Sequence, residues 1–462
     1  MAHAADQARP DATAAEPEEA RGPSSGQRSR GEIPDVPTVT RWNRMWRPFW
    51  ALPAACVIGA VVLGILLPQW EEELGVTRLQ YVFQGGPDGA REVLGTIASA
   101  MISVTGLVFS ITMVVLQLAS SQFTPRVLGG FLQYRVVQGT LGIFLSTFVF
   151  ALTVTRYVRG DNEGEQFVPQ LSVTLAFLMT LACVGFFLAF IHRITTSIQV
   201  SHVISRIGDG TLKLADVMYP ELAAEEPAGF GPTWSPEPGT ARVSPGALRH
   251  GVIVHVDYKG LARWAAEHDA VVTVDRPAGQ FIAEGQQVLG VWGVEELSED
   301  EVRRLYSFLG LSSQREMTQD VAFGIRQLAD IADRALSSGI NDPTTAVQCL
   351  DELHRVLRRL VQRASPSPYI ADADGQVRVV HDPQAINDLV DLAVLEIAHF
   401  GTDTMQVPQR LRMMLEDLLQ VCAPRYRAGV ERLLEGLPDP ATEEEAAGGS
   451  SGGSSGLADS LR

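Results

Sequence analysis

One segment of the chain combines the properties of a membrane helix with a line of polar side chains that could contact ions or water. Between Val93 and Ala119 the sequence has no charged residue, yet small and polar residues recur at the spacing of one helix face. This face, which we call the polar stripe, consists of Thr96, Ser99, Ser103, Gly106, Ser110, Met113, Gln117 and Ser120, and Met113 is its one large apolar member. Hydroxyl and amide oxygens can replace part of an ion's hydration shell or line a column of water.

Three interpretations of the polar stripe are open. Ser99 with Ser103, and Gly106 with Ser110, form small-xxx-small pairs that let membrane helices pack closely, within a protomer or between protomers. Alternatively, the stripe lines a pore, which requires a homo-oligomer because four spans of one chain rarely enclose a path. In the third interpretation the polar face binds a lipid or a small molecule.

Apolar segments elsewhere predict an integral membrane protein. About 20 apolar residues cover the ~30 Å hydrocarbon core of a bilayer, and the sequence predicts that the first span ends before Pro68. The predicted spans are 49–67, 93–119, 136–157 and 171–191. Their interiors contain no Asp, Glu or Lys, which argues against a proton-coupled transporter because proton relays need ionisable groups. Because these spans are apolar, membrane lipid is an expected partner.

The distribution of arginine predicts the orientation of these spans. Four crossings place both termini on one side, and arginines near the spans are more numerous on that side. They are Arg41, Arg44, Arg47, Arg126, Arg135, Arg193 and Arg206, against Arg78, Arg91, Arg156 and Arg159 on the other side. The positive-inside rule then places both termini in the cytoplasm of a bacterial inner (plasma) membrane.

The segment after the second span is expected to form its cytoplasmic mouth. It contains Gln122, Pro125 and Arg126. One interpretation is a helix end with an interfacial anchor. The other is a constriction or hinge, where Arg126 and Arg135 would favour anions or bind acidic lipid head groups.

Composition argues against several classes of function. The net charge of −17 argues against nucleic acid as a partner, since phosphate binding needs a basic surface. The cysteines, which show no zinc-site spacing, are Cys56, Cys183, Cys349 and Cys422. Phosphate-loop, nucleophile-elbow and HExxH motifs are absent from the sequence, and His250, His255 and His268 lack ligand spacing. We therefore expect no catalytic residue, no metal and no cofactor, and a protein that is not an enzyme.

The remaining sequence predicts a cytoplasmic α+β region after the membrane domain. Residues 1–40 and 438–462 have the composition of disordered tails, the second containing a Gly/Ser repeat typical of a flexible linker, native or introduced. The predicted order between them is a four-span membrane domain (41–216), a linker (217–247), a small β-rich unit (248–296) and a helical domain (297–437).

Short-range signals predict where the soluble helices begin. Asp257 is expected to cap one short helix, and Ser298 with Glu301 forms a capping box ahead of another. Asp382, followed by a proline, is expected to cap a third. Alternating segments predict strands at Gly251–Val256, Ala270–Asp275 and Val288–Trp292.

A turn between two of these helices contains side chains that could bind a ligand. Gly339 is expected to end one helix with a positive φ, Asp342 to cap the next, and Pro343 to occupy its first position. Capping accounts for these residues. The alternative is a ligand or cation contact by Asn341 and Asp342.

Three motifs resemble one family of bacterial membrane proteins. The first runs from Gly106 to Arg126, the second is Arg276-Pro-Ala-Gly-Gln-Phe-Ile-Ala-Glu-Gly285, and the third is Ala335-Leu-Ser-Ser-Gly-Ile-Asn-Asp-Pro-Thr-Thr-Ala346. Over roughly residues 45–435 the chain is similar to the domain of unknown function 2254 family. The resemblance implies a membrane protein with a cytoplasmic C-terminal region, and it transfers no activity and no catalytic residue.

Two functions of different classes follow from these features. The leading hypothesis is an oligomeric channel or permeation pathway, lined by the second span and regulated by the cytoplasmic region. The alternative is a non-conducting scaffold or sensor whose cytoplasmic domain binds a partner or ligand. A scaffold would bury the polar stripe against its own first or third span, so the position of the stripe discriminates between them.

Overall fold

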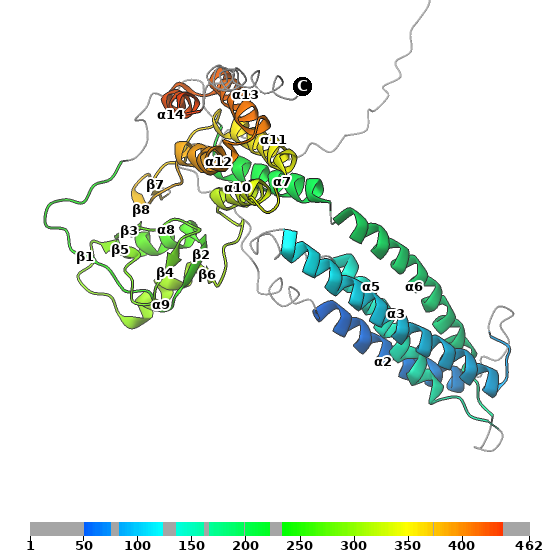
Figure 1. The fold of residues 1–462 in the computed structure, drawn as a ribbon. Helices are drawn as coiled ribbons and strands as arrows, with labels where there is room; N and C mark the ends of the chain where they lie inside the picture. The colour runs from blue at the N-terminus through cyan, green and yellow to red at the C-terminus, as the bar shows by residue number, and fades with distance from the viewer. Residues whose placement is uncertain are drawn as a thin grey trace, which may run out of the picture.

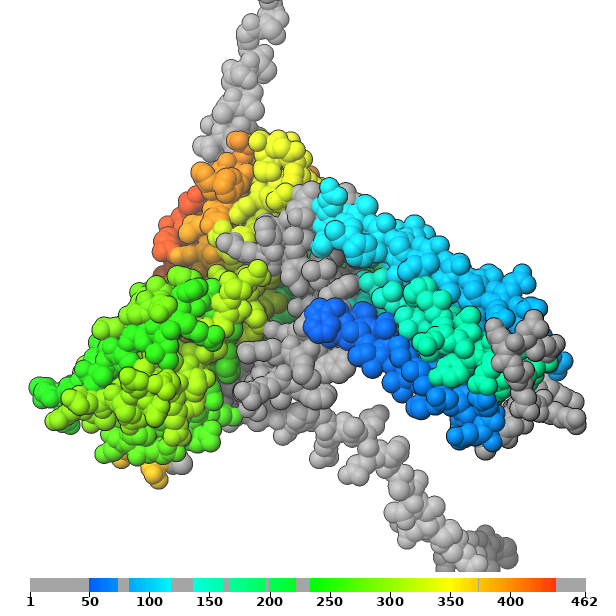
Figure 2. Space-filling view, turned by 90° about the horizontal axis from the view of Figure 1, so that it is seen from below, coloured from blue at the N-terminus to red at the C-terminus, as the bar shows by residue number. Residues whose placement is uncertain are grey.

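The computed structural model describes residues 50–74, 83–122, 135–160, 166–197, 199–221, 233–372 and 374–437. Within these residues the chain forms a bundle of apolar helices, a helical unit and a β unit (Figure 1). Each of the three has its own buried apolar core. In the space-filling view, the bundle and the β unit extend as two arms from the helical unit (Figure 2).

Four helices of the described chain are long and apolar enough to cross a membrane, and they coincide with the predicted spans. They are α2 (Ala51–Leu74), α3 (Pro87–Gln122), α5 (Arg135–Thr155) and α6 (Gln170–Ser197). The central helix is α5, because 56% of its apolar window is buried against 17–22% for the other three. It contacts all three of them.

Close packing within the bundle depends on glycines at the α2–α5 contact. A Cβ atom on Gly64 would lie 3.0 Å from Cβ of Thr153, and one on Gly142 would lie 3.1 Å from Sγ of Cys56. Larger side chains would therefore push these two helices apart. By contrast, a Cβ on Gly106, in the polar stripe, would meet nothing within 4 Å.

The prediction that Pro68 ends the first span is wrong, because α2 continues through it to Leu74. A proline removes one backbone donor, and membrane helices tolerate this loss where neighbouring groups compensate. The longer helix exposes Trp50 just before its start and Trp70 near its end, with 68% and 59% of their surfaces accessible. At about 1.5 Å per residue they lie roughly 30 Å apart, the thickness of the hydrocarbon core, and tryptophan favours both of its boundaries.

The helical unit follows the bundle directly and returns later in the chain. Its helices are α7 (Val200–Met218), α10 (Val321–Leu336), α11 (Pro343–Leu360), α12 (Ile386–Gly401), α13 (Gln406–Val421) and α14 (Pro424–Glu435). The helix α7 packs against α10 and α11, and α11 also packs against α13. Fully buried leucines such as Leu328, Leu353 and Leu415 fill the core between them.

The β unit contains two sheets and two helices. The larger sheet has the order β1-β5-β3-β8-β7, and the smaller has the order β4-β2-β6. The strands are β1 (Arg242–Val243), β2 (Gly251–Val256), β3 (Val271–Val274), β4 (Phe281–Ile282), β5 (Leu289–Trp292), β6 (Leu309–Ser312), β7 (Tyr369–Ala371) and β8 (Val377–His381). The helices are α8 (Tyr258–Glu267) and α9 (Glu299–Ser307). Trp264 on α8 is buried in the core.

The division predicted at residue 296 differs from the structure, because the chain enters the β unit twice. After α10 and α11, the chain returns to add β8 alongside β3, in parallel, with Val272 opposite Val379. The strands β6, β7 and β8 and the helix α9 therefore belong with residues 248–296. This pairing joins residues about 100 positions apart, and local sequence patterns do not specify such partners.

Most of the predicted helix starts are confirmed. The side chain of Asp257 accepts from the Gly260 amide, and Ser298 and Glu301 form both hydrogen bonds of the capping box. The prediction for Asp382 is wrong: α12 begins after Ala385 and has no side-chain cap. Asp382 directly follows the end of β8, and residues 383–385 separate it from Ile386, the first residue of α12. The aspartate is therefore too far from the helix end to cap it.

A buried carboxylate joins the helical unit to the loops around it. Asp320 is fully buried, caps α10 through the amide of Phe323, and accepts from Nε2 of Gln384 at 2.9 Å. The guanidinium of Arg315 donates to the same carboxylate at 2.7 and 2.9 Å. Gly279, from the second family-like motif, has φ +94° and lies so close to Asp320 that no Cβ would fit. This motif thus has a structural role at a junction.

Candidate functional site on α3

The polar stripe lies on the outer surface of the bundle. All of its positions with described burial are exposed, namely Thr96, Ser99, Ser103, Gly106, Ser110, Met113 and Gln117. Ser120 belongs to α3, and its side chain lies outside the described part of the chain. The spacing of the stripe therefore produces one continuous exposed face across the span.

The opposite face of α3 provides its packing within the protomer. Leu94, Ile97, Met101 and Val108 are buried in the bundle core, and α3 contacts α5 and α6. The burial of the stripe against the first or third span, which the scaffold hypothesis expects, is not the arrangement in the described bundle. Among the described residues, no group of the bundle covers the stripe.

Two serine hydroxyls of the stripe donate to their own helix. Oγ of Ser103 donates to the carbonyl of Ser99, and Oγ of Ser110 donates to that of Gly106, both at 2.9 Å. A hydroxyl oxygen that donates its hydrogen still has lone pairs that accept. The stripe consequently presents acceptor oxygens outward without an unsatisfied donor at either serine.

The outer surface of α6 differs from the stripe in composition. Between residues 171 and 191 its large exposed side chains are all apolar, and exposed His192 and Arg193 follow near its end. The exposed apolar side chains are Phe177, Leu178, Leu181, Val184, Phe186, Leu188 and Ile191. Such a surface suits acyl chains. On α3, the stripe is flanked by exposed Ile102 and Leu107, so this helix presents a polar band between apolar edges.

The predicted cytoplasmic mouth lies at the limit of the described chain. Gln122 is the last residue of α3, and its side chain is outside the described part. Pro125 and Arg126 also lie outside the described residues. The expectation of a constriction or anchor at these positions stays a prediction.

A second polar feature of the bundle was not predicted from the sequence. Glu71, near the end of α2, is only 4% exposed, and its carboxylate caps the first turn of α6. The amides of Leu171 and Ser172 donate to its two oxygens at 2.9 and 2.7 Å, and the Ser172 hydroxyl donates as well. A carboxylate at a helix N-terminus satisfies amides that have no partner within the helix. The one hint of this role in the sequence is that Glu71 directly follows Trp70, at the boundary of the membrane.

The α10–α11 turn has the predicted capping role with one correction. Asp342 caps α11, and both of its carboxylate oxygens accept from Thr345, at 3.1 and 2.6 Å. The hydrogen bond from the Thr345 hydroxyl lowers the pKa of Asp342. The positive φ belongs to Asn341, at 49°, and not to Gly339. Asparagine tolerates this conformation, and these contacts favour the capping interpretation over a ligand contact.

The three histidines singled out in the sequence, His250, His255 and His268, perform separate tasks in the β unit. Nδ1 of His255 lies 2.9 Å from Nε2 of Gln319, and burial lowers the pKa of the His255 imidazole. His268 stacks on Trp264 with ring centroids 4.1 Å apart. His250 is exposed. The described residues contain no group of three His, Cys, Asp or Glu side chains placed to hold a metal.

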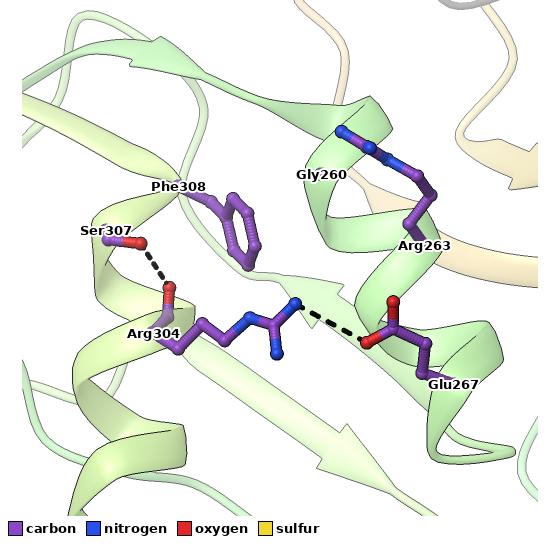
Figure 3. Close-up of a pocket in the computed structure, with 6 residues that line it drawn as sticks. All are labelled: Gly260, Arg263, Glu267, Arg304, Ser307 and Phe308. Carbon is purple, nitrogen blue, oxygen red and sulfur yellow. Dashed lines mark hydrogen bonds and ion pairs between the residues drawn. The ribbon is translucent and has the colours of Figure 1, made fainter.

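A small pocket lies between α8 and α9 (Figure 3). Its volume is about 180 Å³, and its lining residues are Gly260, Arg263, Glu267, Arg304, Ser307 and Phe308. Nη2 of Arg304 lies 3.4 Å from the Glu267 carboxylate, so part of the positive charge is neutralised inside the pocket. This pocket was not predicted from the sequence, because its lining residues come from α8, from α9 and from the residue that follows α9.

A carboxyl pair lies between α10 and α12. Asp333 faces Glu396, and burial together with this neighbour raises the pKa of Asp333 to about 7. Its Oδ1 has no hydrogen-bond partner among the described residues. Arg326 binds Glu396 and Asp330, both at 2.7 Å, and partly compensates the charge.

The fold and the exposed apolar helices define an α-helical integral membrane protein with a mixed helix-and-sheet region after its spans. Over residues 46–417 the chain matches the family described as predicted membrane protein (DUF2254), and it belongs to that family. The resemblance of the three motifs is thereby confirmed.

Relatives of this chain are found in mycobacteria. Uncharacterized proteins of Mycobacterium tuberculosis and Mycobacterium bovis are each 28% identical to this chain over 387 residues, which cover 83% of the chain and 74% of the relative. No solved structure matches the chain significantly. Function must therefore be argued from the geometry.

Proposed function

We propose that this protein forms a homo-oligomeric permeation pathway in the plasma membrane, with the polar stripe of α3 facing the axis. One observation carries the proposal. The stripe is uncharged, continuous and exposed on the protomer, whereas the opposite face of α3 is buried. Polar side chains gain nothing from acyl chains, so symmetric copies that turn these faces together would give them polar surroundings.

The length and chemistry of the stripe suit a conducting wall. From Thr96 to Gln117 it extends about 30 Å along the helix, which matches the hydrocarbon thickness. Its serine oxygens are available as acceptors, and its charge-free composition would bind ions or small polar solutes weakly enough to release them. In such an assembly the buried face of α3 would keep its contacts with the rest of the protomer, and only the exposed stripe would gain new contacts.

The proposal places both termini and the soluble units in the cytoplasm. The arginine distribution supports this orientation, and α7 begins immediately after α6, so the soluble units are attached directly to a span. In this arrangement, the soluble units regulate the pathway and perform no catalytic step.

A second candidate is a non-conducting assembly that acts as a membrane-anchored scaffold or sensor. The observation that favours it is the small size of the exposed residues at Ser103, Gly106 and Ser110. These would let helices from two copies pack closely without leaving a channel. The polar stripe would then be the seam between copies.

Flux through reconstituted protein tests the proposal. We expect purified oligomers in liposomes to conduct ions or release small polar solutes. Ser103→Leu, which adds bulk to the stripe, should reduce that flux strongly. The matched control is Ala182→Leu, an exposed small residue on the apolar face of α6, and its flux should equal that of the wild type.

The oligomeric state separates the two candidates. If wild-type oligomers conduct nothing under any ionic condition, and Ser103→Leu dissociates them, the seam interpretation replaces the pathway. If the wild type is a monomer in native membranes, both candidates are wrong.

A further inference from the structure

One end of the helical unit carries exposed apolar side chains. Ile340 in the α10–α11 turn is 48% exposed, Phe400 near the end of α12 is 51% exposed, and Met405 before α13 is 92% exposed. Ile340 belongs to the α10–α11 connection, whereas Phe400 and Met405 flank the α12–α13 connection. Whether they form one surface depends on how the helices run.

The contacts between α7 and α11 show that these two helices are parallel. Asp209 pairs with Arg355 at 2.7 Å, and further along both helices Asp216 pairs with Arg359 at 2.9 Å. The start of α11, and with it the turn that contains Ile340, therefore lies beside the start of α7.

The helix α13 runs in the same direction. Arg410 pairs with Asp351 at 2.7 Å, and Asp417, later in α13, pairs with Arg358 at 2.8 Å. Met405, which precedes α13, is consequently at the end where α11 begins.

The end of α12 reaches the same place. A Cβ on Gly401 would lie 3.6 Å from Cδ1 of Leu336, the last residue of α10, and would also meet Val407 at the start of α13. Phe400 therefore shares this end with Ile340 and Met405. We call it the proximal end.

The proximal end faces the membrane because of the short connection to the bundle. The helix α6 ends at Ser197 and α7 begins at Val200, and three residues span at most about 10 Å. Figure 1 shows α7 continuing from the end of α6. The start of α7 is thus held near the level at which the last span leaves the bilayer.

The proximal end is also poor in charge. Among the exposed residues of 337–344 and 399–406, Asp403 is the only Asp, Glu, Lys or Arg. The whole chain has a net charge of −17. A surface that touched only water would not need this combination of exposed apolar groups and few charges, whereas the boundary between head groups and acyl chains accepts both.

We infer that Ile340, Phe400 and Met405 insert into the lipid interface of the leaflet that α6 leaves, and that they seat the helical unit on the membrane. The occupant of this surface is the bilayer that already holds the spans. The inference concerns contact with lipid and does not depend on whether the protein conducts.

Site-directed spin labelling of the full chain in liposomes of phosphatidylethanolamine and phosphatidylglycerol tests this contact. Cys56 and Cys422 are replaced by serine, and a label is placed at Met405→Cys. Cys183 and Cys349 are buried and remain. The matched control is a label at Gln420→Cys, an exposed residue at the far end of the same helix.

We expect a several-fold higher ratio of collisions with oxygen to collisions with a water-soluble nickel complex at position 405 than at 420. A label at Phe400→Cys should repeat the result. Equal ratios at 405 and 420 would overturn the inference. Shielding of position 405 from both reagents would overturn it too, since that pattern indicates a second protein surface in place of lipid.

Discussion

The bundle contains two polar features that differ in where their polar groups lie: one is buried within the protomer, and the other is exposed on its surface. The carboxylate of Glu71 is buried, and its hydrogen bonds end on α6 of the same protomer. The polar stripe of α3 is exposed, and its serines bond only their own helix in the contacts described above. A polar group whose partners lie within the protomer stabilises that protomer. A polar group that faces outward instead indicates that its surroundings in the membrane are polar as well.

The largest effect that this comparison predicts is at Glu71. Replacing it with alanine leaves the amides of Leu171 and Ser172 without acceptors, at a cost of about 1–3 kcal/mol for each unsatisfied buried group. We expect a clear decrease in the unfolding temperature of the detergent-solubilised protein, measured by intrinsic fluorescence.

The adjacent Glu72 is the control. It pairs with Arg159 at 3.1 Å, and both side chains are more than 40% exposed, so Glu72→Ala should cost no more than about 1 kcal/mol. Equal losses for the two variants would remove the distinction between buried and exposed carboxylates at this end of the bundle.

An intermediate effect is expected at Asp333, whose carboxyl is only partly satisfied within the protomer. Its pKa is raised to about 7, whereas an unfolded aspartate has a pKa near ~3.9. The folded state therefore binds more protons between these values, and this contribution to stability is present below about pH 4 and is lost as pH rises through 7.

Asp333→Asn should remove that dependence. The variant should gain unfolding temperature relative to the wild type at pH 8 and show little or no gain at pH 4. Arg326, Asp330, Glu396 and Cys349 surround this carboxyl and are left unchanged. A difference between variant and wild type that is the same at every pH would show that the carboxyl does not titrate in this range.

The smallest effect should come from the stripe itself. Ser110→Ala removes an exposed hydroxyl, and exposed substitutions usually change stability by less than about 0.5 kcal/mol. In dilute detergent its unfolding temperature should match that of the wild type. A loss as large as that of Glu71→Ala would mean that the stripe has partners inside the protomer, which contradicts the comparison.

Several features set by neighbouring residues were predictable from the sequence, although the cap at Asp382 and the helix end at Pro68 were not, and features set by distant contacts were not predictable. The caps at Asp257 and Asp342 involve amides three residues away, so their residue types were sufficient to predict them. The role of Glu71 depends on a helix about 100 residues further along, and the pairing of β8 with β3 depends on a similar separation. The choice of Asn341 over Gly339 for the positive φ was decided by the geometry of a whole turn.

The candidate site shows the same division. Its spacing and lack of charge indicated a helix face, and the structure gave the side on which that face lies. What covers the face depends on contacts beyond the described bundle, and the local sequence of α3 does not specify them.

The late arrival of β8 has a consequence for synthesis of the protein. Before residues 377–381 leave the ribosome, β3 has a free edge on the side that β8 later occupies, and free strand edges promote aggregation. The spans are translated first, so they can hold the chain at a bilayer before β8 is made and joins the sheet. Non-local strand pairing is slow. The order of units along the chain thus places the membrane spans ahead of the non-local pairing of β8 with β3.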